Sequence, residues 1–140
     1  MMIISFGWTT PALFADPDLG LDPFARCDPA LQKTETRRSW KASHAARFHE
    51  GDLVQAWDNG PRAGGRRVGT VRLTRELYQE RACDIPGNAW FREGFEYMVR
   101  IGATRDGFNP REFWWRLKAS GELLWVVTFE LVEDLRGNGC

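Results

Sequence analysis

The segment at residues 33–38 holds residue types that could do chemistry together. Lys33 precedes Thr36 by three positions, and Arg37 and Arg38 follow directly. A hydroxyl is a poor nucleophile until a base takes its proton, and a lysine can be that base when burial or nearby cations lower its pKa. The segment is compatible with a nucleophilic site, although as a bare pattern it favours a solvated basic edge strand.

The spacing of these residues sets a condition on the backbone. Residues 33–40 alternate small or polar side chains with long cations, as a strand beside a pocket would. In an extended strand, Thr36 and Arg38 point to one side, while Lys33 and Arg37 point to the other. A turn at Lys33 is therefore needed to bring its amine beside the Thr36 hydroxyl.

Familiar catalytic motifs are missing from the sequence. It contains no P-loop, dinucleotide-binding fingerprint, G-x-S-x-G or H-E-x-x-H. Gly64 and Gly65 are followed by Arg66 and Arg67, and this run could contact a phosphate. The tip of a hairpin explains the two glycines as well.

Cysteine and histidine usage argues against a metal centre. Cys27, Cys83 and Cys140 are far apart, and His44 and His49 stand away from all three. We expect no metal, no cofactor and no disulfide framework, and we interpret both histidines as surface residues. The cysteine count favours a reducing cytoplasm.

Length and charge set the broad class. A chain of 140 residues with zero formal net charge predicts one domain that is not covered in nucleic-acid-binding charge. Residues 33–75 nevertheless hold ten basic and four acidic side chains. They could present a basic face, or pair with acids from the flanking thirds. The seven Trp could fill a core or stack on a flat ligand.

The chain opens with a short apolar run, which we interpret as a first strand rather than a signal peptide. No segment approaches the roughly 20 apolar residues that cross a bilayer, so we expect no membrane partner. Helix caps are expected at Thr10, with Pro11 first inside its helix, at Asn88 and at Asn109. Gly94 weakens a helix over residues 89–97 without ending it.

Strands separated by short helices predict an α+β fold, a small mixed β-barrel with flanking helices. We expect a surface loop at residues 16–31 and a flexible tail at 135–140. The predicted strands are residues 2–6, 33–40, 53–57, 67–73 and 122–132, with helices at 12–15, 89–97 and 110–117, and the hairpin of 53–57 with 67–73 as the surest local prediction.

Two elements of the sequence occur together in a known family. Lys33-x-x-Thr36-x-Arg38 is followed by Phe48 and then by Gly51-Asp52 opening a strand. This arrangement resembles ASCH domains, which belong to the wider PUA-like group, and the resemblance spans residues 2–132. It implies a single PUA-like β-barrel domain over residues 1–134, with residues 16–31 as an insertion.

Within that family, the sequence is similar to small bacterial N(4)-acetylcytidine amidohydrolases. The resemblance implies that Lys33 is the proton acceptor, Thr36 the nucleophile and Glu93 the proton donor, with Glu96 as the alternative donor. Arg38 would stabilise an oxyanion or hold a phosphate. The residues expected to contact substrate or phosphate are Arg37, Arg38, Trp40, Arg66 and Arg67.

Other functions stay open. PUA-like domains resemble RNA-binding modules, so a non-catalytic domain that binds single-stranded RNA or a modified base is the alternative. Some ASCH proteins resemble ribonucleases, and a protein–protein accessory domain with a vestigial pocket is a third possibility. The expected partner is therefore a modified nucleoside or single-stranded RNA.

Overall fold

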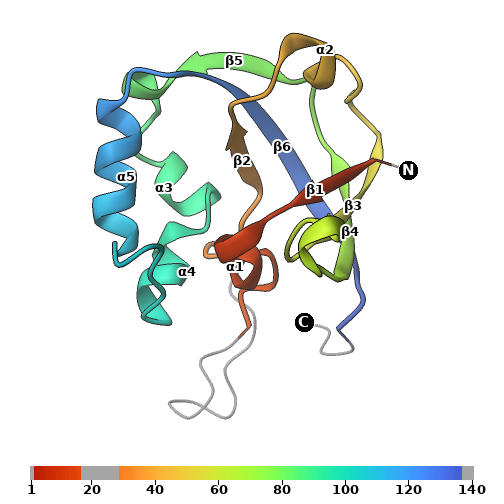
Figure 1. Ribbon diagram of the computed structural model, residues 1–140, viewed down its shortest axis with the longest axis horizontal. Coiled ribbons are helices and arrows are strands. Elements are labelled where there is room, and N and C mark those ends of the chain that lie inside the picture. The colour runs from red at the N-terminus through yellow and green to blue at the C-terminus, as the bar shows by residue number, and fades with distance from the viewer. Residues whose placement is uncertain (1, 17–28, 137–140) are drawn as a thin grey trace.

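The computed structural model describes residues 2–16 and 29–136. A mixed, strongly curved sheet forms one side of the molecule, and the helices between residues 89 and 119 gather at the other (Figure 1). The sheet curls into a half-barrel. This confirms the predicted α+β class, a small barrel-like sheet with short flanking helices.

Six strands build the sheet in the order β1-β3-β4-β6-β2, and β5 also pairs with β6. β1 runs parallel to β3, and every other pair is antiparallel. The strands are β1 (Ile3–Ser5), β2 (Glu35–Arg38), β3 (Leu53–Trp57), β4 (Arg67–Leu73), β5 (Tyr78–Arg81) and β6 (Leu123–Asp134).

β6 is the spine of the sheet. β2 pairs along one part of it, and β4 and then β5 pair with successive parts. Its β-branched and aromatic residues favour a strand, and both of its faces are buried, one through Leu124 and Val126 and the other through Val127 and Phe129. The strand predicted at 122–132 is confirmed, and its pairing with β4 extends it to Asp134.

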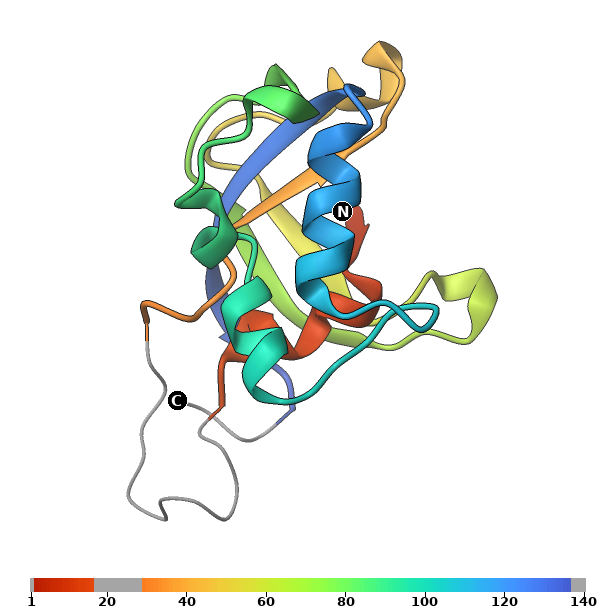
Figure 2. The same cartoon turned by 90° about the vertical axis from the view of Figure 1, so that its left-hand side faces the viewer.

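The predicted hairpin of β3 and β4 is also confirmed, with a bulge between Ala56 and Trp57. Its loop extends away from the rest of the molecule (Figure 2). The sheet closes over an apolar core, which consists of Ile4, Phe6, Leu13, Phe14, Phe48, Val54, Ala56, Val71, Leu73, Val127 and Phe129.

The helices are short. α5 begins as predicted, because the Asn109 side chain accepts a hydrogen bond from the Glu112 amide and Pro110 follows it. α5 packs beside α4 and against the turn after β5 (Figure 2). The helices are α1 (Thr10–Phe14), α2 (Ala42–Ala45), α3 (Ala89–Arg92), α4 (Phe95–Arg100) and α5 (Pro110–Ala119).

Three local predictions about helices are wrong. The helix expected at residues 89–97 is two helices, because Gly94 has a φ of +84° and ends α3 before α4 begins. Asn88 makes no side-chain capping bond. Thr10 lies inside α1, and its hydroxyl donates to the Gly7 carbonyl, 2.6 Å away, in place of capping.

The predicted loop at 16–31 lies mostly outside the described residues, and so do positions 137–140 of the predicted tail. In the described part of that tail, the Leu135 amide bonds to the Val68 carbonyl, and Arg136 pairs with Asp134 and Asp16. Within residues 2–16 and 29–136, no helix has the length and apolar character needed to span a bilayer.

Candidate functional site

Lys33 lies two residues before the start of β2. Its amide donates to the Ala12 carbonyl of α1 at 2.8 Å, and the next amide, Thr34, donates to the Arg92 carbonyl of α3 at 2.8 Å. The Thr34 carbonyl then accepts from the Phe129 amide of β6 at 2.9 Å. Lys33 is thus fixed between two helices and the sheet, outside the regular alternation of β2.

Gly94 lets α3 and α4 approach this lysine. A Cβ at Gly94 would lie 2.4 Å from the Ala12 Cβ and 3.0 Å from the Lys33 Cβ, and its left-handed φ strains any other residue. The close approach places the preceding residue, Glu93, against the Lys33 amine. The absence of a side chain at Gly94 therefore allows Glu93 and Lys33 to meet.

Lys33 and Glu93 form a buried ion pair. Lys33 Nζ lies 3.0 Å from Glu93 Oε2 and also donates to the Glu93 carbonyl oxygen at 2.9 Å. The two side chains are only 1% and 5% exposed. Burial lowers the pKa of Lys33; Glu93 opposes this effect, and the charges of Arg38 and Arg37 add to it.

Arg37 holds the other oxygen of the same carboxylate. Its Nη1 lies 2.8 Å from Glu93 Oε1, and its Nε donates to Glu80 Oε1 at 2.9 Å. Glu35 is 3.5 Å from Arg37 Nη1 and accepts from Arg92 Nε at 2.9 Å. The Glu93 carboxylate is thus oriented by a cation at each oxygen.

Lys33, Arg37 and Glu93 line a cavity of about 340 Å³ between the sheet and the helices. Thr36 is 4% exposed, and its hydroxyl makes no hydrogen bond with the part of the protein that the structure describes. The cavity is lined by Ser5, Phe6, Gly7, Trp8, Thr9, Lys33, Thr36, Arg37, Arg38, Glu93, Phe95, Arg105, Phe113 and Leu117.

Aromatic side chains form much of the cavity wall. The Trp8 ring stacks on Phe95 with centroids 5.9 Å apart, and Phe113 meets Trp8 edge-on at 5.3 Å. Phe6 contributes another face and lies under the Arg38 guanidinium, 5.7 Å from its centroid. The cavity can therefore hold a flat ring beside the Lys33–Glu93 pair.

Arg38 is a cation in this wall that forms no salt bridge with a carboxylate of the described residues. Its Nε is buried and has no hydrogen-bond partner among the described residues. Burial lowers the pKa of Arg38; the charge of Glu93 opposes this and that of Arg105 adds to it. Both the missing partner and the lowered pKa mark an unsatisfied positive group.

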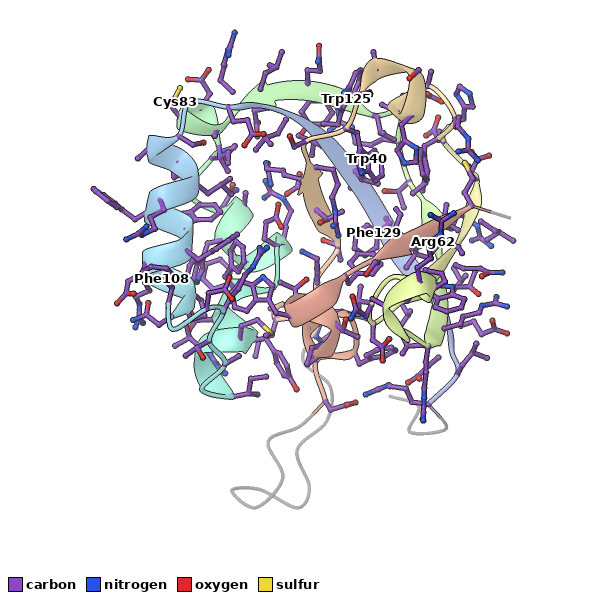
Figure 3. The ribbon with its side chains drawn as sticks, viewed as in Figure 1. Trp40, Arg62, Cys83, Phe108, Trp125 and Phe129 are labelled. Carbon is purple, nitrogen blue, oxygen red and sulfur yellow. The ribbon has the colours of Figure 1, made fainter. Side chains whose placement is uncertain are left out.

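Trp40 does not line the cavity. Its ring stacks on Phe48 at 4.7 Å and meets His44 edge-on at 4.7 Å, next to α2 (Figure 3). His44 is half-buried beside these rings, and His49 is exposed. Glu96, the alternative donor, accepts from Trp90 Nε1 at 2.8 Å and also lies outside the cavity.

Arg66 and Arg67 lie on the β3–β4 hairpin, also outside the cavity. Arg67 Nη2 donates to Thr70 at 2.7 Å and lies 3.4 Å from Glu133. Arg72 pairs similarly with Glu130, so these arginines of the basic middle third do pair with acids of the last third.

Sequence reasoning did not single out Arg105, Trp8, Phe95 or Phe113 as site residues. Arg105 follows α4 in a loop and carries no local signal for a site. Trp8 is one of the seven Trp for which a core and a ligand surface both stayed open, and Phe95 and Phe113 carry no local signal for a site. No group of three or more His, Cys, Asp or Glu side chains in the described ranges, 2–16 and 29–136, is arranged to hold a metal ion.

Comparisons with known proteins give a likeness in structure. No protein-family model matches the sequence. No curated protein matches it either. Among solved structures, the chain is similar to protein EF3133 of family DUF984 from Enterococcus faecalis V583, with 18% sequence identity and a TM-score of 0.44. The match covers 73% of this chain and 62% of that one.

Proposed function

We propose that this protein is an ASCH-type amidohydrolase that removes the acyl group from N(4)-acetylcytidine or a related modified nucleoside. One observation carries the proposal. A buried lysine and a buried carboxylate share a hydrogen bond of 3.0 Å in the wall of a cavity, and a threonine hydroxyl lines the same cavity. These are the base, acid and nucleophile that such a reaction needs.

A single proton transfer along the Lys33–Glu93 hydrogen bond produces both the base and the acid that the reaction needs. When a proton moves from the ammonium to the carboxylate, Lys33 becomes a neutral base and Glu93 a neutral acid. Burial favours this neutral form, since it lowers the pKa of Lys33. The charge of Arg37 lowers the pKa of Lys33 further, and the same guanidinium holds the Glu93 carboxylate at 2.8 Å.

Acylation of the enzyme uses that form. Lys33 takes the hydroxyl proton of Thr36 as its oxygen attacks the carbonyl carbon of the acyl group. Glu93 gives its proton to the leaving amine nitrogen as the C–N bond breaks. The products are a free cytidine amine, an acyl ester on Thr36, and the ionised Lys33–Glu93 pair.

Deacylation restores the starting state. Water attacks the ester carbonyl, and the Glu93 carboxylate takes one of its protons. The Thr36 oxygen leaves with a proton from the Lys33 ammonium, so the neutral pair re-forms and a carboxylic acid is released.

The cavity suits a nucleoside base. Its volume of about 340 Å³ lies in the range of small-molecule sites, and its wall offers aromatic faces for a pyrimidine. The Lys33–Glu93–Arg37 group lies in the same wall, and in this proposal the exocyclic amide meets it there.

The test is hydrolysis of N(4)-acetylcytidine by the purified protein and by T36A. We expect turnover by the wild type and a loss of about a thousandfold or more in the variant, because no nucleophile remains. The matched control is T70A, since Thr70 is an equally buried threonine outside the cavity, 5% exposed against 4%. Wild-type protein that leaves the substrate intact contradicts the proposal for this substrate, and full activity in T36A contradicts the mechanism.

The alternative is a module that binds RNA or a modified base without catalysis. Two features support this alternative as well as they support an enzyme. Arg38 Nε has no acceptor among the described residues, and the cavity wall contains aromatic rings. Binding of single-stranded RNA that weakens steeply with salt and persists in T36A, together with no hydrolysis, would favour the module. RNA cleavage is followed in the same assay, because a ribonuclease would also bind RNA.

A further inference from the structure

The cavity carries more positive than negative charge. Lys33, Arg37, Arg38 and Arg105 line it, and Glu93 is the acidic residue among the described lining residues. Glu93 is already engaged by Lys33 at 3.0 Å and by Arg37 at 2.8 Å. Arg38 and Arg105 are therefore left without an anion inside the cavity.

Two guanidinium nitrogens at this wall are buried without a partner. Arg38 Nε and Arg37 Nη2 have no hydrogen-bond acceptor among the described residues. A buried donor without an acceptor is costly, and most such groups in folded proteins find one. Both side chains line the cavity, so their positive charges act on a ligand inside it.

Arg105 supplies a second charge at the rim. The acid nearest to it is Asp106, 3.9 Å away and itself 86% exposed, so solvent weakens that pair. Its guanidinium also lies 5.3 Å from the Phe113 ring centroid, against the cavity wall. Its charge lowers the pKa of Arg38, whose burial is the larger cause, so the two cations repel each other.

From these contacts we propose that the natural substrate carries a phosphate monoester, which Arg38 and Arg105 bind, so that the protein acts on a nucleotide in preference to the free nucleoside. The inference rests on the proposed function and names its substrate class. An anion bound by both guanidinium groups relieves their repulsion. Guanidinium groups suit phosphate oxygens because they donate in a planar fork.

Two charged contacts should give a nucleotide a clear advantage over a nucleoside. We expect cytidine 5′-monophosphate to bind at least about tenfold more tightly than cytidine, because hydrogen bonds between charged groups are strong where water is excluded. The advantage should shrink as salt is added, since Arg105 is exposed. Titration calorimetry with both compounds measures the ratio without requiring turnover.

Three variants test which arginines cause the tighter binding of the monophosphate. R38M and R105M should each reduce the ratio severalfold or more, whereas R66M should leave it unchanged, because Arg66 is an exposed cation outside the cavity. Arg105 is exposed, so R105M is expected to fold even if R38M does not. An oligonucleotide with a terminal phosphate, used as a further probe, distinguishes the end of an RNA from a mononucleotide as the source of the phosphate.

The outcomes separate this inference from the proposed function. Equal binding of cytidine and its monophosphate overturns the inference, even if N(4)-acetylcytidine is hydrolysed. A preference that survives in R105M and in folded R38M overturns it too. A preference lost in those variants supports it, even if the protein proves to have no hydrolytic activity.

Discussion

Two stretches of this chain are rich in arginine, and they lie in very different surroundings. In the segment at residues 33–38, Lys33 and Arg37 share one carboxylate, Glu93, which is 5% exposed. On the β3–β4 hairpin, Arg67 pairs with Glu133 at 3.4 Å, where the two side chains are 34% and 51% exposed. The first set lines a cavity, and the second faces solvent.

The difference teaches that the type of residue does not decide what a basic stretch does. Water screens and replaces contacts at the hairpin, so its ion pairs contribute little. In the cavity Lys33 and Arg37 are removed from water, and both depend on Glu93. Only in the cavity are charge interactions strong enough to shift pKa values for proton transfer or to bind a charged ligand.

Removing one carboxylate from each region gives the largest contrast. E93Q leaves Lys33 buried without its counter-ion, and we expect it to lower the free energy of unfolding by about 3 kcal/mol. E133Q removes the exposed partner of Arg67 and should cost less than about 1 kcal/mol. Urea denaturation of both variants measures the two values. Similar losses would mean that the two regions do not differ as described.

The glycines of the two regions give a second, smaller contrast. Gly94 and Gly64 both have a left-handed backbone, with φ of +84° and +78°. A Cβ at Gly94 meets Ala12 at 2.4 Å, whereas a Cβ at Gly64 meets no atom within 4 Å. We expect G94A to cost about 2–3 kcal/mol, from strain and overpacking.

The matched variant, G64A, should cost only about 1 kcal/mol, the strain of the left-handed backbone alone. Thermal unfolding followed by circular dichroism compares the two. If G64A is as damaging as G94A, the close approach of Gly94 to Ala12 and Lys33 does not limit the packing of the site.

The smallest effect concerns pH. Burial lowers the pKa of Lys33 in the folded protein below its ordinary value of 10.5. Between the folded pKa and 10.5 the unfolded chain holds a proton that the folded chain has released, so stability rises with pH in that window. The unfolding free energy of the wild type minus that of K33M should therefore increase as pH rises towards 10.5. A difference that shrinks over the same window would contradict the assigned direction of the pKa.

Local patterns were enough to predict much of the sheet and one helix start. β6 and the β3–β4 hairpin follow from β-branched and aromatic residues bounded by turns, and Asn109 caps α5 through a contact within its own first turn. These features depend on neighbours along the chain, which a sequence displays directly.

The site depends on contacts between distant segments, and these were predicted less well. Gly94 was expected to weaken one long helix. It ends α3 because its backbone must pass Ala12 and Lys33, which lie far away in sequence. Arg105 reaches the cavity from a loop, and Trp40 packs on Phe48 although it follows β2 closely. Their placement is a property of the fold, so residue type and spacing did not reveal it.

The most direct measurement of the central claim is a search for an acyl group on Thr36. Wild-type protein mixed with N(4)-acetylcytidine, quenched in acid during turnover and digested, is analysed by tandem mass spectrometry. An acetyl ester on Thr36, absent from T36A and undiminished in the control T70A, is the result expected. Turnover by the wild type without any such ester, or an acetyl group found reproducibly on another residue, would contradict the proposed roles of Lys33, Thr36 and Glu93.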